Sequence, residues 1–330
     1  MKQSSLKSIL IVFRDPKRGG TSVEEIYHGL ILELKKSFDI KVYLYNDQKS
    51  ILFNIQRINQ QHSGVVHITS DMYFLTPFIK GRKILTIHDI EYYKLLRGFK
   101  GFIYRWFWLK FPIRLADRIV VVSSYTENEL LKYFRYDILN KILIIYNPVP
   151  SIYSYKPRKR HNGPPVILQV GTLSNKNLEV VSKALVNIEC EFRIIGVLSS
   201  EQRALLGSCN IRYYNYYNLS YNEVYQHYVN SDIVIFISSF EGFGMPIIEA
   251  NAVGRPLICS NRTSLPEVAC EAALYVENEK DENEVREKIV FLLGDQQMKD
   301  DLVRKGLENI KRFDLAKIVN QYRELYDTYV

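Results

Sequence analysis

Short apolar runs rich in β-branched residues alternate with longer helical patterns through the first half of the chain. Six of these runs have the length of a buried strand: residues 9–13, 41–45, 65–68, 84–87, 119–122 and 142–145. An amphipathic segment lies between the first two runs, and it begins with Ser22 and Glu25 at the spacing of a helix-capping box. Strands that alternate with helices in this way form a parallel sheet. The pattern predicts a Rossmann-like α/β domain over residues 1–150.

The alternation stops at residues 147–165, which hold five of the eleven prolines and a basic cluster. We place a domain linker at residues 151–165. The alternation then restarts, with strand-like runs at residues 166–170, 192–195, 211–214, 233–237 and 256–260. A second Rossmann-like domain over residues 166–312 is therefore expected. Residues 313–330 form an amphipathic segment with no strand after it, which either closes the second domain or crosses back to the first.

Length and charge narrow the class of protein. The 330 residues suit two domains of ordinary size. The apolar run at residues 9–13 is too short for a signal-peptide core, and no stretch approaches the ~18 apolar residues of a spanning helix. We therefore expect a cytoplasmic protein. The formal charge of +8 favours an anionic partner, which alone leaves nucleic acid, an acidic membrane surface and phosphate-bearing substrates open.

Residues 231–268 contain the most informative motif. The apolar run at 233–237 is followed by Gly242 and Gly244, and then by a helical pattern that begins near Pro246. Amides and the helix dipole at such a start favour a phosphate group. Glu249, about one turn into the helix, and Glu241, before the loop, have carboxylates suited to sugar hydroxyls. The alternative is a tight glycine turn with Glu249 merely favouring the helix start.

The segment EGFGMPIIEA at residues 241–250 resembles the Glu-x7-Glu signature of the family 4 glycosyltransferases. Its flanks, residues 219–239 and 254–268, resemble that family too. In the second flank, Ser264 and Glu267 have capping-box spacing. The resemblance implies the GT-B architecture, two Rossmann-like parallel-sheet domains facing across a cleft, and a retaining enzyme. Its donor site would include Glu241, Gly242, Phe243, Gly244, Met245 and Glu249.

A second block, VGTLSNKNLEVVSKAL at residues 170–185, resembles the part of this family that holds the donor's diphosphate. The resemblance assigns Gly171, Thr172, Lys176 and Asn177 to that role. Asn175 departs from the pattern, because a basic residue is expected there. Taken without the resemblance, Lys176 would be an ordinary solvated lysine.

The first domain carries three further matches to the family. His88 and Asp89 follow the strand-like run at 84–87, and the resemblance places the histidine near the donor sugar. Gly19 and Gly20 match a glycine-rich loop after the first strand, and Ser123 matches a serine after the run at 119–122. These residues are expected at the acceptor side of the cleft, where the carboxyl ends of parallel strands bind ligands. The alternative for His88 is a purely structural role.

The implied reaction is transfer of a sugar from a nucleoside diphosphate sugar to a glycan or lipid-linked acceptor in surface polysaccharide assembly. His88, Glu241 and Lys176 are the expected catalytic residues. No Asp-x-Asp motif occurs and the four cysteines lack metal-ligand spacing, so we expect neither a metal nor a cofactor. Alternatives are an inactive sugar-nucleotide-binding protein, or one that hydrolyses or epimerises the donor. A nucleic-acid partner is not expected, because no zinc-finger or ribonucleoprotein signature is present.

Residues 92–116 combine six basic and nine aromatic residues with no acidic residue. On a helical projection one side gathers apolar residues and should face the core: Leu95, Phe99, Phe102, Ile103 and Trp106. The other side should face an anionic membrane at the inner surface: Arg97, Lys100, Arg105 and Trp108. Aromatic rings beside basic groups suit a lipid interface. The alternatives are a solvated basic face and a basic cleft for a phosphorylated acceptor.

Overall fold

The computed structural model describes residues 7–14, 21–61, 64–91, 93, 98–134, 138–158 and 162–329. The chain forms two compact units, of which unit 1 comprises Met1–Pro148 with Leu315–Val330 and unit 2 comprises Val149–Asp314. Residues 151–165, where we expected a linker, belong to unit 2. None of the helices in the described part of the chain combines the length and the hydropathy that a bilayer-spanning segment requires. The predicted site residues Gly19, Gly20 and Arg97 lie outside the described residues.

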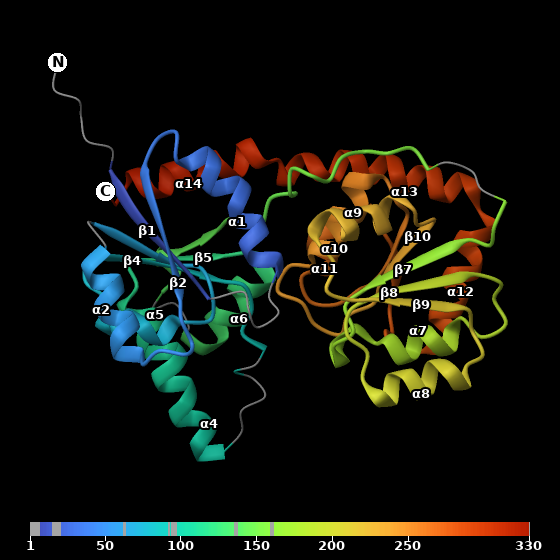
Figure 1. Cartoon of the computed structure of the whole chain (residues 1–330), viewed down its shortest axis with the longest axis horizontal. Helices are drawn as coiled ribbons and strands as arrows, with labels where there is room; N and C mark the ends of the chain where they lie inside the picture. The colour runs from blue at the N-terminus through green and yellow to red at the C-terminus, as the bar shows by residue number, and fades with distance from the viewer. Residues whose placement is uncertain are drawn as a thin grey trace. The chain divides into compact units, whose positions relative to one another are not determined.

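Unit 1 contains a six-stranded parallel sheet in the order β2-β1-β3-β4-β5-β6 (Figure 1). Its strands are β1 (Ser8–Arg14), β2 (Asp39–Tyr45), β3 (Val65–Ile68), β4 (Arg82–Ile87), β5 (Arg118–Val121) and β6 (Ile142–Ile144). The six strands predicted for the first half are confirmed, with ends that differ by at most two residues. Strands β1, β3 and β5 are buried almost throughout because helices cover both faces of a parallel sheet.

The helical segments of unit 1 connect these strands and cover the sheet. They are α1 (Thr21–Leu34), α2 (Ile51–Gln61), η2 (Tyr73–Phe78), α4 (Gly98–Arg105), the π-helical turn η3 (Trp106–Lys110), α5 (Phe111–Leu115), α6 (Ser124–Phe134), η4 (Leu139–Lys141) and α14 (Leu315–Asp327). Helix α14 lies against α1, so the end of the chain completes unit 1 rather than unit 2.

A buried polar network attaches α14 to the sheet of unit 1. The Tyr326 hydroxyl lies 2.7 Å from Nδ1 of His67, and Oγ1 of Thr86 lies 2.7 Å from Nε2 of the same ring. The Tyr27 hydroxyl donates to Thr86 Oγ1 (3.1 Å) and lies 3.2 Å from the Tyr322 hydroxyl. Burial lowers the pKa of His67 to about 3, so the ring is neutral at ordinary pH. These groups satisfy one another's hydrogen bonds inside the core.

Unit 2 also contains six parallel strands, in the order β12-β11-β10-β7-β8-β9. They are β7 (Val166–Val170), β8 (Glu191–Ile195), β9 (Tyr213–Tyr216), β10 (Ile233–Phe236), β11 (Leu257–Ser260) and β12 (Leu274–Val276). The predicted strands are confirmed, although β9 begins two residues later than expected. Strand β12 was not predicted, because its three residues form too short an apolar run to stand out.

The helical segments of unit 2 are η5 (Ser174–Lys176), α7 (Leu178–Ala184), α8 (Ser200–Ser208), α9 (Tyr221–Val229), α10 (Met245–Val253), α11 (Leu265–Ala269), α12 (Glu282–Gly294), α13 (Gln296–Asn309) and η6 (Ile310–Phe313). The strand order reverses between β7 and β10, which are neighbours in the centre of the sheet. Loops that leave two such strands diverge, and open α/β sheets bind ligands at this point. A ligand-binding site is therefore expected at the loops that follow β7 and β10.

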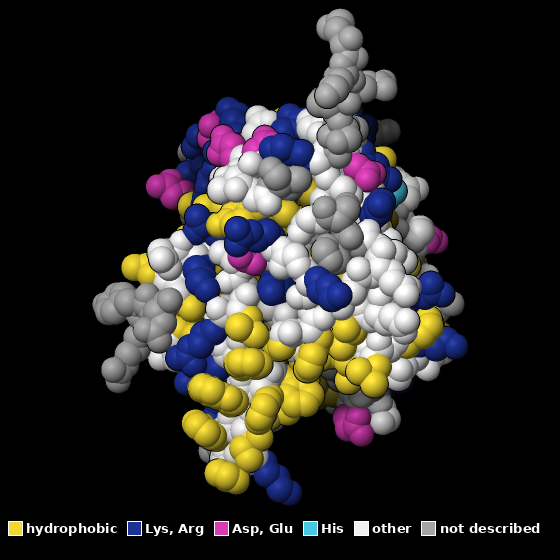
Figure 2. Space-filling model, turned by 90° about the vertical axis from the view of Figure 1, so that its left-hand side faces the viewer, with side chains coloured by type: hydrophobic (Ala, Val, Ile, Leu, Met, Phe, Trp, Pro, Cys, Tyr) yellow, Lys and Arg dark blue, Asp and Glu magenta, His cyan; other side chains and the backbone are white. Residues whose placement is uncertain are grey.

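The predicted orientation of the segment around α4 is wrong. Phe99, Phe102 and Trp106, which we expected in the core, are exposed, and hydrophobic side chains gather on this part of the surface (Figure 2). Trp108, expected to face a membrane, is half-buried and stacks on Tyr104 with ring centroids 4.7 Å apart. The segment is apolar on two sides, so a projection could not identify the one that packs on the sheet. The π-helical turn also shifts the register of an ideal helix.

Candidate functional site

The loop between β10 and α10 has a backbone that only glycine fits without strain. Gly244 immediately precedes α10 with a φ of 104°, and a Cβ there would lie 2.7 Å from Cδ2 of Leu265. Pro246 occupies the first turn of α10, where the missing N–H breaks no helical hydrogen bond. The positive end of the α10 dipole therefore lies at the carboxyl end of β10, as predicted, and favours an anion.

Lys176 and Glu241 form an ion pair between the loops that follow β7 and β10. Both side chains are largely shielded, at 15% and 17% exposure. The Lys176 ammonium lies 4.6 Å from the ring centroid of Phe236 on β10. Its side chain passes over Gly171, where a Cβ would lie 3.0 Å from Lys176 Cε. Gly171 also has a φ of 97°, so this position favours glycine for conformation and for space.

Asn175 links the two loops. Its Nδ2 donates to the Phe240 carbonyl (3.0 Å) and to Oε1 of Glu241 (3.3 Å), and its carbonyl accepts from the Ser239 amide (2.8 Å). This residue stands where the family pattern has a basic side chain. In this chain it supports Glu241 as a neutral hydrogen-bond donor.

Glu249 is a buried carboxyl group with an unusual environment. Only 6% of the residue is exposed, and the Tyr228 hydroxyl on α9 donates to its Oε2 at 2.6 Å. Burial raises the pKa of Glu249 to about 7, against the opposing effects of the Tyr228 hydrogen bond and the Lys176 charge. A carboxyl group tuned in this way and close to a lysine is typical of a binding or catalytic site.

Asn177 and Thr172 shape the loop after β7. Asn177 has a left-handed φ of 51°, and its Nδ2 donates to the Ile237 carbonyl (2.6 Å) and to Ser239 Oγ (3.1 Å). The Thr172 hydroxyl donates to the Val197 carbonyl at 2.7 Å. These contacts give both residues a structural role in fixing the backbone from which Lys176 extends.

Lys280 is a cation that the sequence analysis missed. Its Nζ donates to Oδ1 of Asn177 at 2.5 Å, so it lies at the same sheet edge as Lys176. Lys280 follows β12 in the chain. A prediction of that strand would have placed Lys280 at this edge of the sheet. Among the described residues, His, Cys, Asp and Glu side chains do not gather in groups of three or more that would hold a metal.

The loop after β11 holds the Glu241 backbone on both sides. The Glu241 amide donates to Thr263 Oγ1 (3.1 Å), and the Ser264 hydroxyl donates to the carbonyls of Glu241 (2.9 Å) and Phe243 (3.0 Å). The expected capping box of Ser264 and Glu267 is wrong, because the Ser264 side chain forms no capping hydrogen bond with α11. Its hydroxyl is engaged by the glycine loop instead.

In unit 1, three predicted residues lie at the carboxyl ends of β4 and β5. Nε2 of His88 donates to the Thr69 carbonyl (2.9 Å), and burial lowers the pKa of this ring. Asp89 is exposed and accepts from the Glu91 amide (3.2 Å). Ser123 is buried, where its Oγ accepts from the Thr126 amide at the start of α6 (3.1 Å). Ser123 therefore has a clear capping role in this structure.

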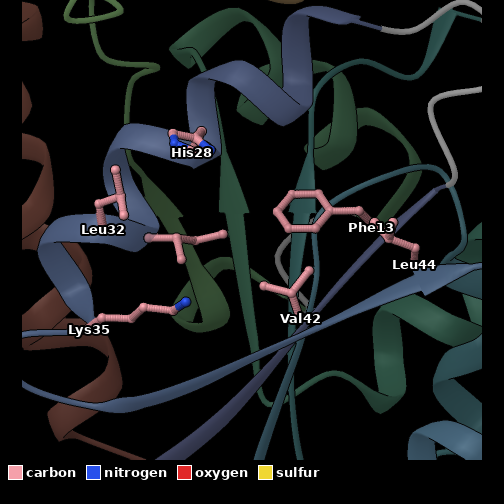
Figure 3. A pocket seen from close by; sticks show the side chains of 7 residues that line it. Phe13, His28, Leu32, Lys35, Val42 and Leu44 are labelled. Atoms are coloured by element: carbon pink, nitrogen blue, oxygen red, sulfur yellow. The ribbon is translucent and has the colours of Figure 1, made fainter.

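An apolar hollow of about 250 Å³ lies between α1 and β2 of unit 1 (Figure 3). Its polar side chains are His28 and Lys35, and the remaining lining is apolar: Phe13, Ile31, Leu32, Val42 and Leu44. None of the predicted site residues that the structure describes lines it. The hollow is therefore separate from the residues described above, which lie in the loops after β7, β10, β11 and β12 of unit 2 and at the carboxyl ends of β4 and β5 of unit 1.

Solved structures with this fold span nearly the whole chain. A sucrose-phosphate synthase from Thermosynechococcus elongatus matches with a TM-score of 0.78 and 15% identity over 98% of each chain. The Anabaena protein HepE, in complex with UDP-glucose, matches with a TM-score of 0.76 and 15% identity over 97% of this chain and 99% of that one. At such identities the likeness establishes the fold, which is GT-B.

Family models identify the chain more closely. Residues 154–309 match the model for glycosyl transferases group 1, and residues 16–151 match the model for glycosyltransferase family 4. The chain belongs to these glycosyltransferases and is a transferase.

Curated relatives agree with this assignment. An uncharacterised glycosyltransferase of Methanocaldococcus jannaschii is 26% identical over 74% of this chain and 68% of its own length. O-antigen chain mannosyltransferase B of Escherichia coli is 27% identical over 64% and 60%. A Campylobacter jejuni N,N'-diacetylbacillosaminyl-diphospho-undecaprenol alpha-1,3-N-acetylgalactosaminyltransferase is 29% identical over 30% and 26%. The matches to the last two relatives thus span less than two thirds of their lengths.

Proposed function

We propose that this protein is a retaining glycosyltransferase that moves a sugar from a nucleoside diphosphate sugar to a glycan or lipid-linked acceptor in surface polysaccharide assembly. The observation that carries the proposal is the grouping of Lys176, Glu241 and the start of α10, with buried Glu249 one turn further on. A cation and a helix start suit the two phosphates of a donor, and two carboxylates suit the hydroxyls of its sugars.

Each residue has a definite role in the proposed reaction. Lys176 and the N-terminus of α10 stabilise the negative charge that develops on the departing diphosphate. Glu249 accepts hydrogen bonds from the ribose hydroxyls, and Glu241 accepts them from the transferred sugar. Lys280 adds a second positive charge at the edge where Asn175 is neutral. His88 and Asp89 act on the acceptor side, as the family resemblance implies.

In this proposal no divalent metal takes part, because a lysine and a helix start neutralise the leaving group. Turnover should then be unaffected by EDTA. Activity that disappears with EDTA and returns with magnesium or manganese would contradict this part of the proposal.

The proposed class of acceptor is based on the names of two relatives. One is named as an O-antigen chain mannosyltransferase and another as acting on a diphospho-undecaprenol-linked sugar. By analogy, the acceptor here is a growing glycan, either free or linked to a lipid. The protein then works in the cytoplasm, peripherally on the inner face of a membrane.

The deciding experiment is a panel of nucleoside diphosphate sugars screened by thermal shift, followed by product analysis with glycan and lipid-linked acceptors. A donor that binds the folded state raises the melting temperature. NMR of the product should give the same anomeric configuration as the donor. Inversion would exclude the retaining mechanism, free sugar as the sole product would indicate a hydrolase, and an epimerised donor would indicate an epimerase. Donor binding without any product would indicate a binding protein.

A further inference from the structure

Seven large apolar side chains are exposed along one segment of unit 1, at between 39% and 77% of their surface. We call this set the apolar ridge: Phe99, Phe102, Ile103, Trp106, Phe107, Phe111 and Leu115. The ridge follows α4, η3 and α5, and Figure 2 shows hydrophobic side chains gathered on this part of the surface. Single exposed apolar residues are ordinary, but a continuous group of this kind marks an interaction surface.

The ridge cannot turn inward, because the other side of the segment is already packed. Leu109 and Ile113 are fully buried in the core of unit 1. Tyr104 and Trp108 stack with an angle of 7° between their rings, and Trp108 also contacts Phe74, with centroids 6.2 Å apart. A rigid base therefore holds the ridge residues outward.

Basic side chains accompany the ridge. Lys100, Arg105, Lys110 and Arg114 lie on the same segment, and residues 98–116 contain no Asp or Glu. The Arg114 guanidinium lies 5.5 Å from the ring centroid of Trp106, so a cation and an exposed indole lie side by side. Aromatic rings next to basic groups match the boundary between headgroups and acyl chains. Protein interfaces, by contrast, are depleted in lysine at their centres.

We propose that the apolar ridge inserts into an anionic lipid bilayer, with the basic residues on its flanks contacting the headgroups. This inference assigns a membrane-binding surface to the protein placed at a membrane in the proposed function. It rests on the proposed function in one respect only, because a lipid-linked acceptor would lie in the same bilayer. It also replaces the face expected from the sequence: the phenylalanines and Trp106 enter the lipid, while Trp108 supports them from beneath.

The binding test uses the whole protein and two vesicle types, phosphatidylcholine alone and phosphatidylcholine mixed with phosphatidylglycerol. We expect co-sedimentation with the anionic vesicles, weakened but not abolished by high salt, since salt screens charges and leaves apolar insertion intact. The variant F99S/F102S should lower the partition coefficient by about tenfold or more, because two inserted rings are lost. Unchanged binding of F99S/F102S would overturn the proposal.

Matched controls separate the ridge from general surface hydrophobicity and charge. Leu52 is as exposed as Phe99, at 77%, and Phe291 is exposed on α12, so L52S/F291S removes comparable apolar surface elsewhere. This control should bind vesicles as the parent does. K100Q should weaken binding several-fold at low salt, whereas K80Q, an exposed lysine outside the ridge, should not. Equal loss of vesicle binding in F99S/F102S and L52S/F291S, or in K100Q and K80Q, would contradict the proposal.

Tryptophan fluorescence reports insertion directly, because the only two tryptophans of the chain are Trp106 and Trp108. Anionic vesicles should shift the emission to the blue, and W106F should lose most of that shift. A dimer that buries the ridge and ignores vesicles would overturn the proposal in favour of self-association. None of these measurements needs a donor, so failed membrane binding stays distinguishable from failed transfer.

Discussion

The hydroxyl oxygen of Thr263 accepts a hydrogen bond from the backbone N–H of Glu241 at 3.1 Å, and Thr263 does so with a left-handed φ of 53°. A β-branched residue in this region is strained by about 1–3 kcal/mol. The adjacent Ser264 hydroxyl holds the Glu241 carbonyl at 2.9 Å. The loop after β11 thus fixes the Glu241 backbone at the expense of stability, which is typical of a functional site.

Replacing Thr263 with glycine should therefore separate stability from activity. T263G relieves the strain but leaves the Glu241 amide without its acceptor, so the two effects should largely cancel and the free energy of unfolding should change by less than about 1 kcal/mol. It also removes the acceptor for the Glu241 amide, so kcat should fall about tenfold while donor affinity changes less. T263S keeps the hydroxyl and should retain activity. A T263G variant that is destabilised by more than about 1 kcal/mol, or that keeps the parental kcat, would contradict this assignment.

The contact between Tyr228 and Glu249 predicts a pH dependence. Because Glu249 has a pKa of about 7 and acts as an acceptor when ionised, kcat/KM should rise as the pH increases through about 7. Y228F removes a hydrogen bond that favours the ionised form, so the midpoint should move to higher pH. Y225F is the matched control, since the Tyr225 hydroxyl donates to the Ser154 carbonyl instead. An unchanged midpoint in Y228F would exclude Glu249 as the titrating group.

The same carboxyl group should affect the free energy of unfolding, which it should lower as the pH rises, whereas kcat/KM should increase. Its pKa in the folded protein lies above the unfolded value of about 4.3. The stabilising contribution of Glu249 to the folded state is therefore fully present below about pH 4.3, the unfolded pKa, and is lost as the pH rises toward 7. In E249Q, the free energy of unfolding should depend less on pH in this window, as denaturant titrations at several pH values would measure.

The sequence predicted the strands of both sheets well, because buried parallel strands are continuous β-branched runs such as those of β1 and β10. It also predicted the loop around Gly242 and Gly244, where backbone chemistry is local. Lys280 and Thr263 were missed for a physical reason. Their roles depend on the packing of β11 and β12 beside β10. Contacts between residues far apart in the sequence produce no local sequence pattern, so these roles could not be predicted. The ridge was assigned to the wrong side because both sides of its segment are apolar.

Lys176 should contribute mainly to turnover. In K176A the departing diphosphate loses the cation that pairs with Glu241 in the loop before α10, so kcat should fall by about 10²–10³. K183A, which removes an exposed lysine of α7 paired with Glu282 at 3.8 Å, should leave kcat unchanged. Steady-state kinetics with the identified donor would measure both. Full turnover in a folded K176A would remove Lys176 from the catalytic residues and would leave the ion pair with Glu241 as a structural contact only.

The attachment of α14 to unit 1 should depend on one hydroxyl. Y326F leaves Nδ1 of buried His67 without its partner at 2.7 Å, which should lower the free energy of unfolding by about 1–3 kcal/mol. Y329F should change it by less than about 0.5 kcal/mol, since this partly exposed ring keeps its contact with Arg118 at 5.7 Å. His67 has a folded pKa of about 3, below the unfolded value of about 6.5.

Neutral His67 therefore contributes stability that is present above about pH 6.5 and declines as the pH falls toward 3. In H67Q, which removes the titrating group, the free energy of unfolding should fall less steeply over this range than in the parent. Urea titrations followed by circular dichroism at several pH values measure both quantities. If Y326F and Y329F are equally stable, the hydroxyl contributes nothing net, and apolar packing of the α14 tyrosines alone would hold the helix.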